Sequence, residues 1–214
     1  LGGSDLHLVI IPGSDPAASI RVPFHVADRL RILESLEGVE AARWDALAGG
    51  NPTVSHAFLD SLHRSGCASA KSGWAPRYLT LWDGARLEGA VPLYLKSHSY
   101  GEYVFDWAWA DAYERHGLAY YPKLLAAVPF TPASGARLLA ASEAARSELA
   151  RELLQMARDS EVSSLHVLFP CEADANALRA AGLLERSGVQ FHWRNAGYAD
   201  FGQFLGVLSR DKRK

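Results

Sequence analysis

A β-hairpin is predicted in residues 78–95, which read Tyr78-Leu-Thr-Leu-Trp-Asp-Gly-Ala-Arg-Leu-Glu-Gly-Ala-Val-Pro-Leu-Tyr-Leu95. Two apolar runs flank Asp83-Gly84, and an Asp-Gly pair favours the tight turn that joins antiparallel strands. Pro92 has no backbone N–H to donate to a strand ladder, so we expect the second strand to lie near a sheet edge or to bulge there.

Helical and strand patterns alternate on both sides of this hairpin. Strands are predicted at 29–36, 164–169, 183–186 and 189–194, with a buried one at 124–130; helices are predicted at 39–48, from Ser55, at 107–116, from Ser142 to about 160, at 172–181 with Gly182 as its stop, and from Asp200. This order predicts an α/β (α+β) fold, a mixed and mostly antiparallel sheet flanked by helices.

The chain divides into three predicted parts. Residues 1–28 are rich in Gly and Pro and predict an irregular extension, with a short strand at 6–11. Residues 29–199 form the predicted domain, and residues 200–214 begin a basic helix. Because the chain opens at Leu1 and closes on this basic stretch, we expect it to be a fragment of a longer protein.

Composition excludes several classes of protein. The 214 residues are 49% hydrophobic and carry a net charge of -2, which excludes a disordered chain and a bulk attraction to nucleic acid or anionic membrane. No segment approaches the roughly 18 apolar residues of a membrane span. Cys67 and Cys171 are too few and too far apart for a disulfide scaffold or thiolate metal site, so we expect free thiols, no metal and a cytoplasmic location. The chain contains no G-x-S-x-G, Walker A, H-E-x-x-H or C-x-x-C motif.

Residues 92–123 carry the chemistry of the chain, because charged side chains are interleaved there with many Tyr and Trp residues. Such a mixture suits a ligand that is partly flat or sugar-like and partly ionic, although each aromatic could equally be a packing residue. The candidate general bases are Asp106, Glu102 and His98, and the candidate substrate-binding residues are Lys96, Tyr103, Trp107, Trp109, Asp111 and Lys123. We expect Lys96 and Asp106, with the aromatics, to line an open cleft.

The same segment resembles a family of uncharacterised proteobacterial FemAB-like proteins in the GNAT (Gcn5-related N-acetyltransferase) superfamily. The resemblance extends from about residue 29 to 214 and includes Asn51-Pro-Thr-Val-Ser-His-Ala-Phe58 and Val189-Gln-Phe-His-Trp193. It implies a GNAT-like fold and the first half of a two-half protein, whose second half would follow Lys214. It also implies a relationship to the Fem transferases, which carry amino acids from aminoacyl-tRNA onto peptidoglycan precursors; a tRNA or a diphosphate would then meet the basic end of the chain.

One departure concerns the coenzyme. GNAT enzymes bind the pyrophosphate of coenzyme A with a Q/R-x-x-G-x-G/A loop, whereas residues 130–138 here have one Gly, and Pro132 lacks an N–H. Ser134, Gly135 and Arg137 could hold an anion only weakly. Acetyl-CoA or another acyl-CoA is therefore disfavoured, and no cofactor is established.

Three functions remain open from the sequence. The first is the N-terminal half of an acyl- or aminoacyl-transferase that acts on an amine acceptor such as a cell-wall precursor. The second is a non-catalytic binding domain for a cell-envelope precursor or peptide. The third is a small-molecule N-acetyltransferase.

Overall fold

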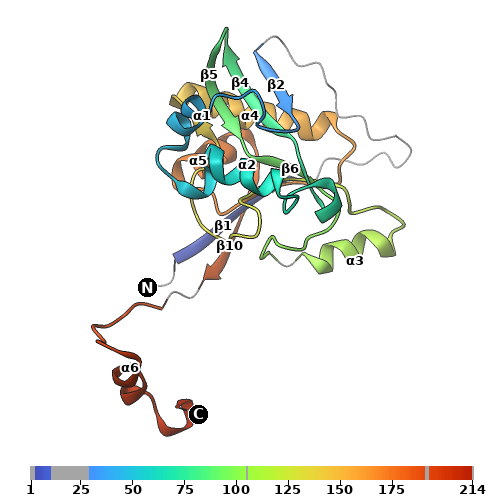
Figure 1. The fold of residues 1–214 in the computed structure, drawn as a ribbon. Coiled ribbons are helices and arrows are strands. Elements are labelled where there is room, and N and C mark those ends of the chain that lie inside the picture. The colour runs from blue at the N-terminus through green and yellow to red at the C-terminus, as the bar shows by residue number, and fades with distance from the viewer. Residues whose placement is uncertain (1–2, 11–28, 105, 191–192, 214) are drawn as a thin grey trace. The chain divides into compact units, whose positions relative to one another are not determined.

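The strands pair in two sheets in a computed structural model that describes residues 3–104, except 11–28, and residues 106–190 and 193–213 (Figure 1). The larger sheet has the spatial order β10 (Leu184–Gln190), β1 (Gly3–Ile10), β9 (Leu165–Leu168), β7 (Lys123–Ala126), β6 (Leu93–Lys96) and β3 (Trp74–Pro76). The smaller sheet has the order β2 (Leu30–Leu33), β4 (Tyr78–Asp83), β5 (Arg86–Val91) and β8 (Leu139–Ala140). Strand β7 runs parallel to β9, whereas the β4–β5 and β6–β7 pairs are antiparallel.

A single long hairpin joins the two sheets. Strands β4 and β5 pair around the predicted turn, and β3 and β6 continue the same pairing on the far side of Pro92. The Arg77 N–H donates to the Leu93 carbonyl at 2.8 Å, so the ladder resumes directly beyond the proline. Because Pro92 has no N–H, the ribbon loses a bond at this point, and its two ends belong to different sheets.

The helices of the larger unit are α1 (Ala41–Ala48), α2 (His56–Arg64), α3 (Trp107–Arg115), α4 (Glu143–Asp159) and α5 (Glu172–Ala181), with 3₁₀ turns at Pro52–Val54 and Ala70–Ser72. Helix α6 (Phe201–Val207) and a 3₁₀ turn at Arg210–Lys212 belong to the C-terminal part of the chain. In Figure 1, α1 and α2 lie in front of β4 and β5 and α4 lies behind them. One apolar cluster packs Leu79 and Leu81 against Leu149, and a second packs Tyr78 against Trp44.

Capping side chains begin these helices where the sequence predicts. The Ser55 hydroxyl accepts a hydrogen bond from the Phe58 N–H, and Ser142 accepts one from Ala145. Gly182 ends α5 with φ 105°, a left-handed conformation that glycine adopts without steric cost. The predicted mixed α/β class, with antiparallel sheets flanked by helices, is confirmed, and the arrangement is consistent with a GNAT-like fold.

Several predicted boundaries need correction. The short strand predicted at 6–11 is present but begins earlier: residues 3–10 form β1, which pairs with the buried strand β9, so this part of the predicted irregular extension belongs to the larger sheet. One strand, β10, replaces the two predicted around Gly188. The final helix ends at Val207, and a separate 3₁₀ turn holds Arg210–Lys212, so these basic residues do not extend α6. Residues 11–28 and Lys214 lie outside the described residues.

The chain separates into two compact units, residues 5–188 and residues 189–214 with 1–4. Within the described part of the smaller unit, the Phe204 ring contacts the rings of Trp193, Tyr198 and Phe201. Across the described residues, no helix combines the length and the apolar character that crossing a membrane requires.

Candidate functional site

Two lysines lie opposite each other in the interior of the larger unit. Lys96 on β6 and Lys123 on β7 are register partners in the antiparallel ladder, and both side chains are 0% exposed. Directly paired residues point to the same face of a sheet, and like charges in that position repel each other. A buried lysine pair therefore needs anionic partners from elsewhere in the chain.

Lys123 receives these partners from the loop that leads into α3. Its Nζ donates to Glu102 Oε2 at 2.8 Å, to Asp106 Oδ2 at 2.5 Å and to the Ser99 hydroxyl at 2.9 Å. All three acceptors lie between residues 99 and 106, so one ammonium group holds this loop against the sheet. The sequence predicted Lys96 and Lys123 as substrate-binding residues; in the structure their acidic partners are Glu102 and Asp106 of the chain itself.

Lys96 has a less complete set of partners. Its Nζ donates to the Tyr100 carbonyl at 3.2 Å, lies 3.7 Å from the centroid of the Trp74 ring, and is 3.9 Å from Glu102 Oε1. Burial lowers the pKa of Lys96 to about 7, even though the Glu102 carboxylate opposes the shift. The amine is consequently close to its protonation midpoint at neutral pH.

The two carboxylates respond differently to burial. Burial raises the pKa of Glu102 above its ordinary value, and the Lys123 charge only partly opposes this. Burial also disfavours ionised Asp106, but the charge and hydrogen bond of Lys123 outweigh it and hold the pKa of Asp106 below its ordinary value. Glu102 Oε1 and Asp106 Oδ1 have no hydrogen-bond partner among the described residues.

A chain of polar side chains extends the cluster through Tyr120, His166 and Ser164. The Tyr120 hydroxyl donates to Asp106 Oδ2 at 2.8 Å and lies 3.3 Å from His166 Nε2, which is 2.9 Å from the Ser164 hydroxyl. Sequence reasoning did not select Ser99, Tyr120 or His166. A histidine within the apolar run of residues 164–169 was the one available signal, because a buried imidazole needs a polar partner.

A row of aromatic rings lies at the surface beside this buried cluster; we call His98, Tyr100 and Trp107 the aromatic row. The centroids of His98 and Tyr100 are 5.1 Å apart, and those of Tyr100 and Trp107 are 5.4 Å apart. Tyr100 is 65% exposed and Trp107 is 44% exposed. The Tyr100 carbonyl accepts hydrogen bonds from Trp74 Nε1 and Lys96 Nζ, both at 3.2 Å, so buried groups fix the backbone of the row.

His98 is held in one orientation at the end of the row. A Cβ atom at Gly73 would overlap the imidazole, so the absence of a side chain there makes room for the ring. The Tyr100 N–H donates to His98 Nδ1 at 3.3 Å. Burial and the nearby Lys96 charge lower the pKa of His98, which favours a neutral ring with its proton on Nε2.

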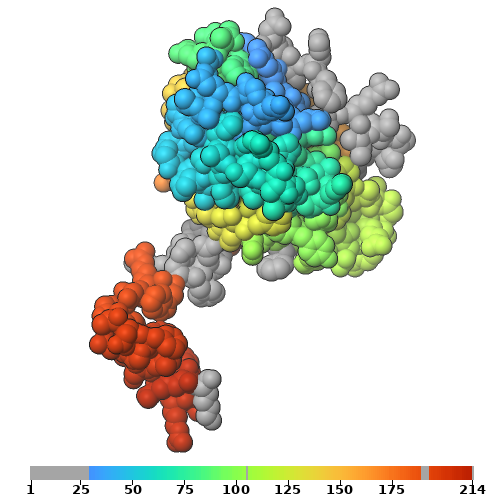
Figure 2. All heavy atoms as spheres, viewed as in Figure 1, coloured from blue at the N-terminus to red at the C-terminus, as the bar shows by residue number. Residues whose placement is uncertain are grey.

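The other predicted substrate-binding residues lie at the surface, outside the buried cluster. Tyr103 is 59% exposed and has φ 60°, and Trp109 is exposed on α3 with the Arg186 guanidinium 6.0 Å from its ring. Asp111 is exposed on the same helix, which forms part of the surface of the larger unit in Figure 2. The structure thus brings Lys96, Glu102, Asp106 and Lys123 together in the interior and leaves the aromatic candidates at the surface.

In residues 130–138, the N–H groups of Gly135, Arg137 and Leu138 and the Arg137 side chain are hydrogen-bonded within the chain. The N–H groups of Arg137 and Leu138 both donate to Asp174 Oδ2, at 2.6 and 3.0 Å. The Arg137 side chain is 0% exposed and donates to the carbonyls of Leu168, Ala136 and Ala133; burial lowers the pKa of Arg137 to about 10. The Gly135 N–H donates to the Phe169 carbonyl at 3.0 Å, and Ser134 is exposed.

Open cavities lie elsewhere in the described residues. Four of them, about 450–680 Å³ in volume, are lined by residues other than the predicted site residues. In the part of the chain that the structure describes, no group of three or more His, Cys, Asp or Glu side chains is placed to hold a metal ion. Lys96 and Asp106 therefore do not line an open cleft in this conformation, because the ion pairs of the cluster close the space between them.

Fold and site together describe a mixed α/β domain that carries an aromatic surface above a buried ion cluster. Comparison with protein families places it more closely: the chain belongs to the FemAB-like family, whose model is described as peptidoglycan biosynthesis/recognition and matches residues 35–214. Neither the curated proteins nor the solved structures contain a match to the chain.

Proposed function

We propose that this chain is the acceptor-recognition half of a FemAB-like acyl- or aminoacyl-transferase, and that it binds an amine-bearing peptidoglycan precursor on the aromatic row. The family match supports a role in peptidoglycan biosynthesis or recognition. Within the aromatic row, Tyr100 and Trp107 are exposed and His98 is half-buried. The row supports the proposal, because exposed aromatic faces on a fixed backbone suit the sugar and peptide parts of such a precursor.

The positions of the candidate bases favour recognition over catalysis by this half. A general base must come within hydrogen-bond reach of the amine that it deprotonates. Glu102 and Asp106 are 3% and 4% exposed and are paired with Lys123. His98 uses the lone pair of Nδ1 for the Tyr100 N–H. In this proposal Glu102 and Asp106 act as partners of Lys123, His98 is part of the binding surface, and the transfer step belongs to another part of the intact protein.

The hydrogen bonds within residues 130–138 bear on the identity of the acyl donor. An acyl-CoA pyrophosphate needs free backbone N–H groups, and those of Gly135, Arg137 and Leu138 already have acceptors inside the protein. We therefore propose aminoacyl-tRNA, the donor that the family resemblance implies, together with a cytoplasmic reaction. Calorimetry with acetyl-CoA tests the point: a dissociation constant below about 10 μM would contradict it.

Binding of a soluble muramyl pentapeptide, measured by calorimetry, tests the recognition role. Trp107→Ala should weaken binding about tenfold, the effect of removing a well-packed aromatic contact. Phe201→Ala removes an exposed ring from the smaller unit and should change affinity by less than about twofold. Equal losses in both variants, or no binding by the unmodified chain at about 1 mM ligand, would refute the proposal.

A further inference from the structure

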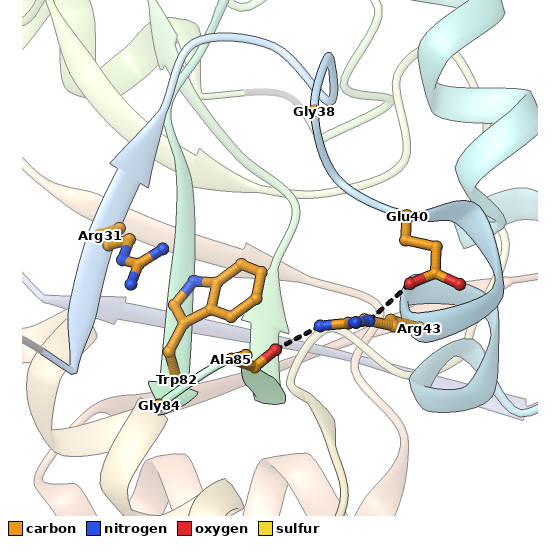
Figure 3. A pocket seen from close by; sticks show the side chains of 7 residues that line it. All are labelled: Arg31, Gly38, Glu40, Arg43, Trp82, Gly84 and Ala85. Carbon is orange, nitrogen blue, oxygen red and sulfur yellow. Dashed lines mark hydrogen bonds and ion pairs between the residues drawn. The ribbon is translucent and has the colours of Figure 1, made fainter.

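A second concave surface lies at the turn end of the β4–β5 hairpin and shares no residue with the aromatic row. We call it the Trp82 pocket; its volume is about 500 Å³ and its lining residues are Arg31, Gly38, Glu40, Arg43, Trp82, Gly84 and Ala85 (Figure 3). This volume lies within the range of about 300–1,000 Å³ that small-molecule sites occupy.

The pocket arises because α1 covers only part of one sheet face. Tyr78, Thr80 and Trp82 alternate along β4 and point to the same face. Trp44 of α1 packs against Tyr78 with ring centroids 5.8 Å apart, and both residues are 0% exposed. Trp82 is only partly buried, so its indole remains accessible beside the helix.

Hydrogen bonds hold the indole in a fixed position. Thr80, which is 0% exposed, donates from its hydroxyl to the Arg31 carbonyl at 3.0 Å. The same hydroxyl oxygen accepts the Trp82 Nε1–H, also at 3.0 Å. Arg31 and Thr80 are register partners, which places the Arg31 side chain on the face that carries Trp82. Its guanidinium lies 4.8 Å from the centre of the indole.

The lining of the pocket carries excess positive charge. Arg43 donates from Nε to Glu40 at 2.6 Å and from Nη1 to the Ala85 carbonyl, which fixes its guanidinium beside the β4–β5 turn. Among the described residues Arg31 has no carboxylate partner within ion-pair distance. Figure 3 shows Arg31 and Arg43 on opposite sides of Trp82. Two guanidinium groups thus line the pocket with one carboxylate, that of Glu40, which pairs with Arg43.

We propose that the Trp82 pocket binds a ring-bearing anion, in which a carboxylate or phosphate group is carried on an aromatic or sugar ring. A flat guanidinium matches both kinds of oxyanion with paired N–H donors. The indole offers an apolar face to the ring of the ligand. Because the positions of Trp82 and Arg43 are already fixed by hydrogen bonds, binding orders few additional groups. This site is independent of the acceptor site proposed above.

Titrations followed by NMR at the Trp82 indole Nε1–H resonance test the proposal, with that resonance identified from its loss in Trp82→Phe. Phenyl phosphate and benzoate are the two anionic probes, and their separate affinities distinguish phosphate from carboxylate recognition. Inorganic phosphate lacks the ring and benzyl alcohol lacks the charge. At least one anionic probe should bind about tenfold more tightly than both of these controls.

Arg31→Gln should weaken that probe about tenfold, the cost of losing one charge-assisted contact. Arg86→Gln is the matched control, because Arg86 is an exposed cation of the same hairpin that pairs with Asp83 and does not line the pocket. Equal weakening by the two variants would show non-specific attraction and overturn the proposal. It would also be overturned if inorganic phosphate bound as tightly as phenyl phosphate, or if no probe bound at about 10 mM.

Discussion

Replacing Lys123 by methionine tests the buried cluster most directly. Methionine fills a similar volume but leaves Glu102 and Asp106, both at least 96% buried, without the ammonium group that lies 2.8 and 2.5 Å from them. Removing one partner of a buried ion pair costs about 3–5 kcal/mol, a large part of the roughly 5–15 kcal/mol that stabilises a domain. The Lys96 ammonium, 3.9 Å from Glu102 Oε1, compensates only weakly.

The stability lost in Lys123→Met should depend on pH in a defined direction. In Lys123→Met, the uncompensated carboxylates have pKa values raised above those in the unfolded chain, so the folded state binds more protons. The free energy of unfolding of the variant should therefore fall as the pH rises from about 5 to 8, relative to the unmodified chain. Chemical denaturation at both pH values measures this difference.

Two controls complete the experiment. Lys71→Met makes the same change at an exposed position and should cost less than about 0.5 kcal/mol. Adding Glu102→Gln and Asp106→Asn to Lys123→Met removes the uncompensated charges and should recover part of the loss. A cost below about 1 kcal/mol for Lys123→Met, or a loss independent of pH, would refute the buried-cluster argument.

Three further changes have defined outcomes. Because burial lowers the pKa of Lys96 to about 7, the folded state binds fewer protons than the unfolded chain above that pH. The free energy of unfolding should therefore rise as the pH increases beyond about 7. Denaturation curves of Lys96→Met should not show this rise. Tyr103→Gly should stabilise the fold by up to about 1 kcal/mol in thermal melts, since glycine adopts φ 60° without steric cost, whereas Tyr103→Ala should give no gain. Asp174→Ala removes the acceptor of two buried N–H groups and the partner of the Arg146 guanidinium, which lies 2.7 Å from Asp174 Oδ1. The substitution should lower the free energy of unfolding by about 3–5 kcal/mol. Formate should restore stability better than chloride at equal ionic strength.

Local signals predicted the beginnings and ends of elements well. Ser55, Ser142 and Asp200 each accept a backbone N–H three residues later, an interaction that depends on neighbouring residues alone. The Asp83-Gly84 turn forms for a similar reason. The extent of the last helix was wrong, because hydrophobic periodicity does not show where α6 gives way to a 3₁₀ turn after Val207.

The candidate site was predicted only in part. Residues 92–123 do contain the buried ions and the surface rings, but the open cleft expected around Lys96 and Asp106 is a closed cluster. Whether a charged side chain faces water or another charge depends on strand register, and the pairing of Lys96 with Lys123 is set by tertiary contacts between β6 and β7.

The amino-acid sequence by itself determined the mixed α/β class, the central hairpin, the caps of the helices and the segment that holds the site, because each follows from periodicity or from contacts within a few residues. Tertiary structure alone decided that the hairpin divides between two sheets at Pro92, that residues 3–10 enter the larger sheet, and that Lys123 holds Glu102 and Asp106. These features join residues far apart in the chain, whose proximity no local pattern encodes.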